Sequence, residues 1–177
     1  MLKILSSLAM LQAASAAPPP AAPPAMPPPA CDAPAHGGFD FWVGEWDVFA
    51  TGSGQKVAES RIERKHNGCA VIETWMPLRG EGGTSLNHLD PVTGMWRQKW
   101  VGSRPGAVEF SGGLTAGKMV LTGNWPNPVD RHQLIRMTYT PNPDGSVRQF
   151  GEASTDHGVS WQASFDFTYR PKKDSSQ

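Results

Sequence analysis

The sequence predicts an all-β fold, an antiparallel up-and-down β-barrel of about ten strands over residues 37–171. After residue 37 the apolar runs are short, rich in β-branched and aromatic residues, and alternate with polar positions. Gly, Pro, Asn and Asp bound these runs every ten to fourteen residues or so, and no window shows a helical period. Tight connections favour antiparallel neighbours, and closing the sheet removes its exposed edges. A β-sandwich is the alternative fold.

Each of the first nine expected strands ends in residues that favour a turn. The first three end at TGSGQ, at NG and at the glycine-rich RGEGG, and the next three at DPVTG, GSRPG and TAGK. The remaining turns are PNPVD, NPDG and DHG. In chain order, the expected strands are residues 39–50, 56–66, 69–77, 84–89, 95–101, 107–114, 119–125, 131–140, 146–155 and 159–170.

The N-terminus has the layout of a secretory signal peptide over residues 1–16, with one lysine, an apolar run and small residues before a cleavage point. That run is too short to span a bilayer, and no later segment reaches the roughly 20 apolar residues of a transmembrane helix. Residues 17–36 are mostly Pro and Ala and predict an extended spacer, and residues 172–177 form a polar tail. We therefore expect an exported protein, periplasmic or secreted, with no transmembrane segment.

Two cysteines, Cys31 and Cys69, predict one disulfide in an exported chain. A metal site or a nucleophilic thiol is the alternative, but no CxxC or Cys-His spacing supports either. The chain has 16 basic and 16 acidic residues, and removing the signal peptide takes away Lys3, which leaves 15 − 16 = −1. Without a clustered basic face, this balance argues against nucleic acid or anionic lipid as the main partner.

The first strand, within GGFDFWVGEWDVFAT, carries two tryptophans in phase. With a period of two, Trp42, Gly44, Trp46 and Val48 share one face, which is the candidate for the barrel interior. We interpret Trp46 as a structural residue that plugs one end of the barrel, because aromatic burial alone holds such a ring in place. The alternative is that it lines a ligand site.

The fifth and third strands supply the best candidates for a cavity wall. Trp96, Gln98 and Trp100 share a face opposite basic residues, which predicts an aromatic interior with one amide. In the third strand Glu73 shares a face with Trp75, but Ile72 on the opposite face competes for the interior, so both phases stay open.

If Trp75 points inward, Glu73 does too, and a buried carboxylate must be paired or protonated. The sequence offers Arg136 and Glu152 as partners, and an internal cluster with Gln98 is one arrangement. A satisfied core network or a set of surface pairs is the other. The candidate ligand-binding residues are thus Glu73, Trp75, Trp96, Gln98, Trp100, Arg136 and Glu152.

The stretch STDHGVSW, residues 154–161, matches the Asp-box pattern of sialidase-like hairpins. Asp156 is expected to accept hydrogen bonds from the turn, Gly158 to adopt a positive φ and Trp161 to pack on the hairpin. Propellers repeat this motif many times, whereas this chain carries it once and is too short for a propeller. We interpret it as a structural turn.

The Gly-x-Trp of the first strand resembles the entry strand of lipocalins and related calycin barrels. Together with IERKHNGCAVIETW, TSLNHLDPVTGMWRQKWV and FDFTYR, it resembles a family of uncharacterised exported bacterial proteins, a domain of unknown function with a calycin-like barrel. The resemblance covers the chain from Cys31 to Arg170 and implies the barrel and the Cys31–Cys69 pairing. It brings no established activity and no catalytic residue. His157 departs from the glycine expected in its turn.

The leading interpretation is a non-enzymatic protein that binds a small, largely apolar molecule with one polar end, without cofactor or metal. An enzyme would use Glu73 or Glu152 as a general base and an arginine to hold an anionic substrate, although no HExxH, GxSxG or phosphate loop is present. A haem barrel would need an inward histidine, for which His88 and His132 are candidates. An envelope interaction module would show an exposed apolar patch.

Overall fold

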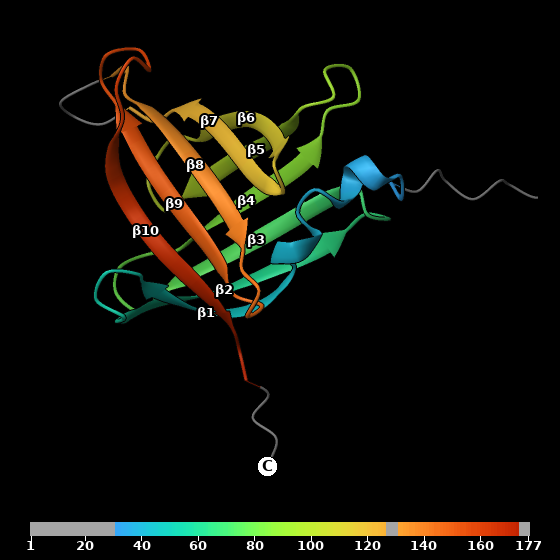
Figure 1. The fold of residues 1–177 in the computed structure, drawn as a ribbon, viewed down its shortest axis with the longest axis horizontal. Coiled ribbons are helices and arrows are strands. Elements are labelled where there is room, and N and C mark those ends of the chain that lie inside the picture. Colours follow the sequence, from blue (N-terminus) through green and yellow to red (C-terminus); the bar gives the residue numbers. More distant parts are fainter. Residues whose placement is uncertain (1–30, 127–130, 174–177) are drawn as a thin grey trace, which may run out of the picture.

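A computed structural model describes residues 31–126 and 131–173, and these residues form a closed antiparallel β-barrel. Each strand pairs with its neighbours in the chain, and β1 pairs with β10, which closes the sheet as an up-and-down barrel and excludes the sandwich (Figure 1). The strands are β1 (Gly44–Ala50), β2 (Lys56–Lys65), β3 (Ala70–Pro77), β4 (Gly83–Leu89), β5 (Trp96–Gly102), β6 (Val108–Thr115), β7 (Lys118–Asn124), β8 (Leu134–Pro141), β9 (Val147–Ser154) and β10 (Gln162–Pro171).

The alternation of strand direction gives the barrel two distinct ends. The hairpins β2–β3, β4–β5, β6–β7 and β8–β9 lie at one end, where the chain also enters β1. We call this the closed end, because the N-terminal segment covers it. The connections β1–β2, β3–β4, β5–β6, β7–β8 and β9–β10 lie at the other end, which we call the open end.

The chain enters the barrel through two short 3-10 helices, η1 (Pro34–Gly37) and η2 (Asp40–Trp42). The prediction that the first strand begins at residue 39 is therefore wrong, since β1 begins at Gly44, whose φ of 149° favours glycine. Trp42 is fully buried, but it reaches the interior from η2 and not from a strand face. Contacts with distant strands outweigh the local alternation here.

The closed end is filled by aromatic side chains from η2 and the strands around it. Phe39 packs edge-on against Trp96 and Tyr139, with ring centroids 5.2 and 5.4 Å apart. Trp46 is 5% exposed and its indole N–H donates to the Trp42 carbonyl oxygen at 2.9 Å, so it belongs to the same packed layer. These side chains fill the closed end of the barrel completely, so a cavity can form only between this layer and the open end.

The predicted disulfide between Cys31 and Cys69 is confirmed. It ties the start of the described chain to the β2–β3 hairpin, where Cys31 N–H also donates to the Asn67 carbonyl at 2.9 Å. Arg64 of β2 donates to the Cys31 carbonyl at 2.9 Å and forms an ion pair with Asp40 of η2. These contacts hold the N-terminal segment across the closed end (blue in Figure 1).

The hairpin between β9 and β10 has the contacts expected of an Asp-box turn. The Asp156 carboxylate accepts the Ser160 N–H at 2.9 Å, and these bonds, led by the Ser160 hydroxyl, lower its pKa to about 2. Gly158 has a φ of 87°, and its carbonyl accepts the Trp161 indole N–H at 3.0 Å. His157, where the resemblance suggests glycine, also has a positive φ of 59°.

The chain ends refine the predicted domain boundaries. Lys172 of the expected polar tail is tied to the barrel, because its N–H donates to the Glu45 carbonyl at 2.8 Å and its ammonium lies 2.6 Å from Glu59. The predicted signal peptide, residues 1–16, and most of the spacer lie outside the described residues. None of the described helices has the length and apolar character of a membrane span.

Candidate binding cavity

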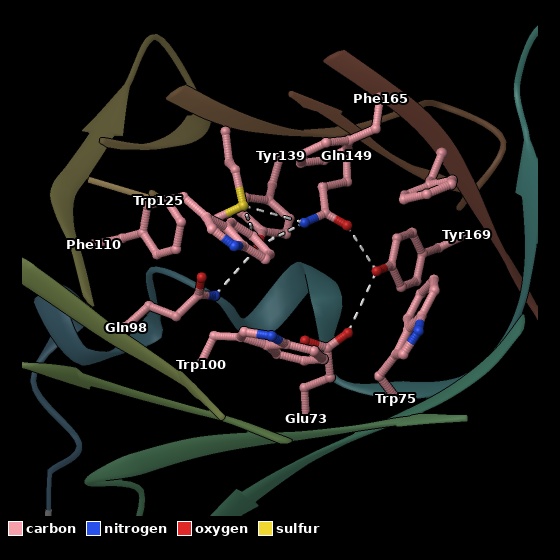
Figure 2. Close-up of a pocket in the computed structure, with 12 residues that line it drawn as sticks. Glu73, Trp75, Gln98, Trp100, Phe110, Trp125, Tyr139, Gln149, Phe165 and Tyr169 are labelled. Atoms are coloured by element: carbon pink, nitrogen blue, oxygen red, sulfur yellow. Dashed lines mark hydrogen bonds between the residues drawn. The ribbon is translucent and has the colours of Figure 1, made fainter. Parts of the chain in front are cut away.

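A cavity of about 280 Å³ lies inside the barrel, above the packed closed end. This volume lies near the lower limit for pockets that hold small ligands. Eight of the lining residues are aromatic (Figure 2). The lining consists of Glu73, Trp75, Gln98, Trp100, Phe110, Trp125, Met137, Tyr139, Gln149, Phe165, Phe167 and Tyr169.

The phase of β3, which the sequence left open, places Glu73 inside. Val71 and Glu73 are buried at 0% and 5% exposure and Trp75 lines the cavity, whereas Ile72 lies on the outer face. The same alternation on β5 places Gln98 and Trp100 in the cavity wall. The structure thus brings together four of the predicted ligand-binding residues.

The cavity wall near the open end consists of aromatic rings that pack against glycines and against one another. A Cβ added to Gly83 would lie 2.6 Å from the Trp100 ring, and one added to Gly151 would lie 2.2 Å from the Phe165 ring. Phe165 stacks on Phe167 with centroids 5.5 Å apart, and Phe167 in turn packs on Trp75 at 5.6 Å. The missing side chains at these two glycines therefore leave room for the rings that shape the cavity.

Seven polar side chains from six strands are joined in a closed circuit of hydrogen bonds, which we call the inner polar ring. Its members are Glu73, Ser85, Asn87, Gln98, Tyr139, Gln149 and Tyr169. On one side, Ser85 Oγ donates to Glu73 Oε2 at 3.0 Å, and Asn87 Nδ2 donates to Ser85 Oγ at 3.1 Å. Gln98 Nε2 then donates to Asn87 Oδ1 at 2.8 Å.

The other side of the inner polar ring runs through two tyrosines. Gln98 Nε2 and Gln149 Nε2 both donate to the Tyr139 hydroxyl oxygen, at 3.2 and 3.0 Å. Tyr169 donates to Gln149 Oε1 at 2.8 Å, and its hydroxyl lies 3.3 Å from Glu73 Oε1, as Figure 2 shows. Trp42 packs against the side chains of Tyr139 and Tyr169, with ring centroids 4.9 and 5.7 Å away. The packed residues of the closed end therefore hold this half of the inner polar ring in place.

Two polar atoms of the inner polar ring are left for a ligand. The Tyr139 hydroxyl hydrogen has only the Met137 thioether, 3.7 Å away, as an acceptor among the described residues, and a thioether is a weak acceptor. The Gln98 side-chain oxygen accepts no hydrogen bond in the same part of the chain. A donor and an acceptor are therefore available beside the aromatic wall.

Glu73 has no cationic partner in the described part of the chain. Burial raises its pKa to about 7, against the opposing effect of hydrogen bonds from Ser60, Ser85 and Tyr169. The protonated form also completes the ring, because Tyr169 gives its one hydrogen to Gln149 and can then accept the hydrogen of Glu73. Both forms of Glu73 are populated near neutral pH.

Arg136 and Glu152 lie on the outer face, so the predicted internal cluster does not form. Arg136 Nε donates to Glu152 Oε2 at 3.0 Å, and its guanidinium lies 4.2 Å from the centroid of the Trp161 ring. Trp161 of the β9–β10 hairpin thus covers Arg136 from outside the barrel. The inward residues of β8 are Ile135, Met137 and Tyr139.

Trp96 shares the inward face of β5 with Gln98 and Trp100, but it lies at the closed end and does not line the cavity. The sequence reasoning also missed five lining residues whose pattern was visible. Phe165, Phe167 and Tyr169 alternate along β10, and Met137 and Tyr139 alternate along β8. The other three lining residues that were missed, Phe110, Trp125 and Gln149, had no such signal.

Metal and haem sites find no support in the described residues. No three His, Cys, Asp or Glu side chains there are placed to hold a metal ion, and the cavity lining contains no histidine. His88 and His132, the candidates for a haem ligand, are exposed. No known protein-family model matches the sequence, and the search of curated proteins also found no match. The resemblance to a domain of unknown function stays a prediction.

Proposed function

We propose that this protein binds a small, largely apolar molecule with one polar end inside the barrel. The observation that supports this function is the cavity itself, an aromatic wall that ends at the inner polar ring. Binding sites commonly combine apolar walls with a few fixed polar groups. The apolar part of the ligand would contact Trp75, Trp100 and Phe167, and the polar end would reach Gln98, Tyr139 or Glu73.

We also propose that the protein acts after export, in the periplasm or outside the cell. The disulfide supports this location, because such bonds persist in oxidising compartments. The signal-peptide pattern of residues 1–16 supports it independently.

The direct test is native mass spectrometry of the exported, purified protein, compared with the same sample after unfolding and extraction. A small molecule released on unfolding is the expected result, and it would identify the ligand class. Trp100→Ala should lose that molecule, whereas Lys99→Ala, which changes the outward neighbour, should retain it. If the native protein has only the mass of its own chain and unfolding releases no small molecule, the proposal is contradicted.

An enzyme is the second candidate, because Glu73 has a pKa near 7 in a cavity, as a general base requires. The position of Arg136 on the outer face removes the arginine that was expected to hold an anionic substrate. If Glu73 is a base, the extracted molecule should change in mass during incubation with wild-type protein and stay unchanged with Glu73→Gln.

A further inference from the structure

The charge inside the cavity is one-sided. Among the lining residues, all of which the structure describes, Glu73 is the one carboxyl group, and no lysine, arginine or histidine is present. Two other lining groups titrate, Tyr139 and Tyr169, and burial raises the pKa of both hydroxyls, so they stay neutral. Any charge that the cavity itself carries is therefore negative.

The side chains that surround Glu73 supply hydrogen bonds but no positive charge. Ser60 of β2 and Ser85 of β4 donate to its two oxygens at 3.0 Å, and Tyr169 of β10 lies 3.3 Å away. Towards the open end, a second recess is lined by two charged residues, Glu81 and Arg104, which have opposite signs. Ionised Glu73 thus lacks a counter-ion within the described structure, and a buried carboxylate without one is costly.

The aromatic rings near Glu73 favour the same sign of ligand charge. Trp75, Trp100 and Tyr169 lie around the carboxyl group in Figure 2. The faces of aromatic rings carry negative electrostatic potential and attract cations, and tryptophan attracts them most strongly. A carboxylate together with tryptophan faces is the chemistry that recognises an organic ammonium group.

We infer that the polar end of the ligand is a cation, an alkylammonium or a similar amine, which pairs with Glu73 against the Trp75 and Trp100 rings. The inference rests on the proposed function, because it specifies the polar end of the same ligand. The apolar part fills the remaining aromatic cavity. A carboxylate ligand such as a fatty acid is disfavoured, because it would bring a second negative charge beside Glu73 with no cation to pair with.

The charge of the ligand can be tested with three probes that share one chain: octylammonium, 1-octanol and octanoate. Binding is followed by tryptophan fluorescence and by calorimetry at pH 8, where Glu73 is mostly ionised. We expect octylammonium to bind at least tenfold more tightly than 1-octanol, and octanoate to bind most weakly. Glu73→Gln should remove the advantage of octylammonium and leave 1-octanol within twofold of wild type.

Two further measurements test whether the effect belongs to the charge of Glu73: a control variant that lacks an outward carboxylate, and a pH series on the unmodified protein, which involves no substitution. Glu109→Gln removes an outward carboxylate whose side chain is 74% exposed and should leave all three affinities unchanged. In unmodified protein, octylammonium should bind about a hundredfold more weakly at pH 5 than at pH 8, because Glu73 is then protonated.

The possible outcomes separate this inference from the function on which it rests. If 1-octanol or octanoate binds as tightly as octylammonium, and Trp100→Ala weakens that binding, the cavity binds apolar ligands but the inference of a cation is wrong. If none of the three probes binds, both the inference and the proposed function are overturned.

Discussion

Replacing Glu73 by glutamine should make the barrel more stable at neutral and alkaline pH. Glutamine has nearly the shape of the protonated acid. Its oxygen can accept the hydrogen bond from Ser85, and the two hydrogens of its amide group can be donated to the hydroxyl oxygens of Tyr169 and Ser60. It cannot ionise, and it therefore avoids the burial of an unpaired negative charge. The effect must depend on pH, because only the ionised form of Glu73 is costly.

The magnitude follows from the pKa of Glu73 in the two states. Burial raises it from 4.5 in the unfolded chain to about 7 in the barrel. Below pH 4.5 the group is protonated in both states and costs nothing. As the pH rises to 7 the unfolded chain ionises first, so the free energy of unfolding falls by about 3 kcal/mol and then stays level. Glu73→Gln should not show this loss.

The assay is urea denaturation of wild type and Glu73→Gln from pH 4 to pH 8.5, and the quantity of interest is the difference between the two free energies. Other titrating groups cancel in that difference. We expect it to rise by about 3 kcal/mol in favour of the variant between pH 4.5 and 7.5. Glu109→Gln is the control, and it should follow the wild-type pH dependence. A difference that does not change with pH would refute the assignment of Glu73 as a buried, unpaired acid.

Three further predictions concern other parts of the barrel. Cys69→Ser should lower the free energy of unfolding by up to about 4 kcal/mol, since the bridge spans 38 residues; an unchanged denaturation curve would make the bridge energetically idle. Trp100→Ala should weaken ligand binding at least tenfold while Lys99→Ala stays within twofold, and equal effects in titrations would show that the cavity face is wrong. Gly151→Ala should cost about 1–3 kcal/mol in thermal unfolding, because the new Cβ meets the Phe165 ring; a neutral effect would mean that the ring moves freely.

Most strand positions and the antiparallel order were predictable, because alternation and turn residues are local signals. Closure was only favoured over a sandwich, because the pairing of β1 with β10 joins residues far apart in the sequence. On β5 the face was predictable too, since aromatic residues alternate with basic ones. On β8 the alternation of Ile135, Met137 and Tyr139 was also visible, but Arg136 was still offered as an inward residue in phase with Leu134. In the structure that face is the outer one, and Trp161 from the β9–β10 hairpin lies over Arg136. Residues 39–43 also alternate, but contacts of Phe39 with Trp96 and Tyr139 hold them out of the sheet.

The inner polar ring could not be predicted for a related reason. Its members are ordinary polar residues, and only the register of the strands brings them together: Ser85 lies opposite Glu73, and Gln98 lies opposite Asn87. A shift of one residue in either pair would turn these side chains to the outer face. The sequence supplied Glu73 and Gln98 as candidates, but it offered Arg136 as the partner where the barrel supplies hydroxyl and amide groups.

The stability and the binding of this barrel are linked through one proton. A cation needs ionised Glu73, so the logarithm of its association constant should rise by about one for each pH unit below 7 and level off above. A ligand that accepts the proton of Glu73 should instead bind less tightly above pH 7, and a ligand that contacts only the aromatic wall should show neither slope. Ionised Glu73 lowers the free energy of unfolding of the empty barrel above pH 4.5, and this loss is largest from pH 7 upward. A bound cation should therefore increase the free energy of unfolding most at pH 7 and above. If the association constant and the free energy of unfolding both level off near pH 7, both effects are assigned to Glu73, whereas different levelling points would separate the ligand site from this carboxyl group.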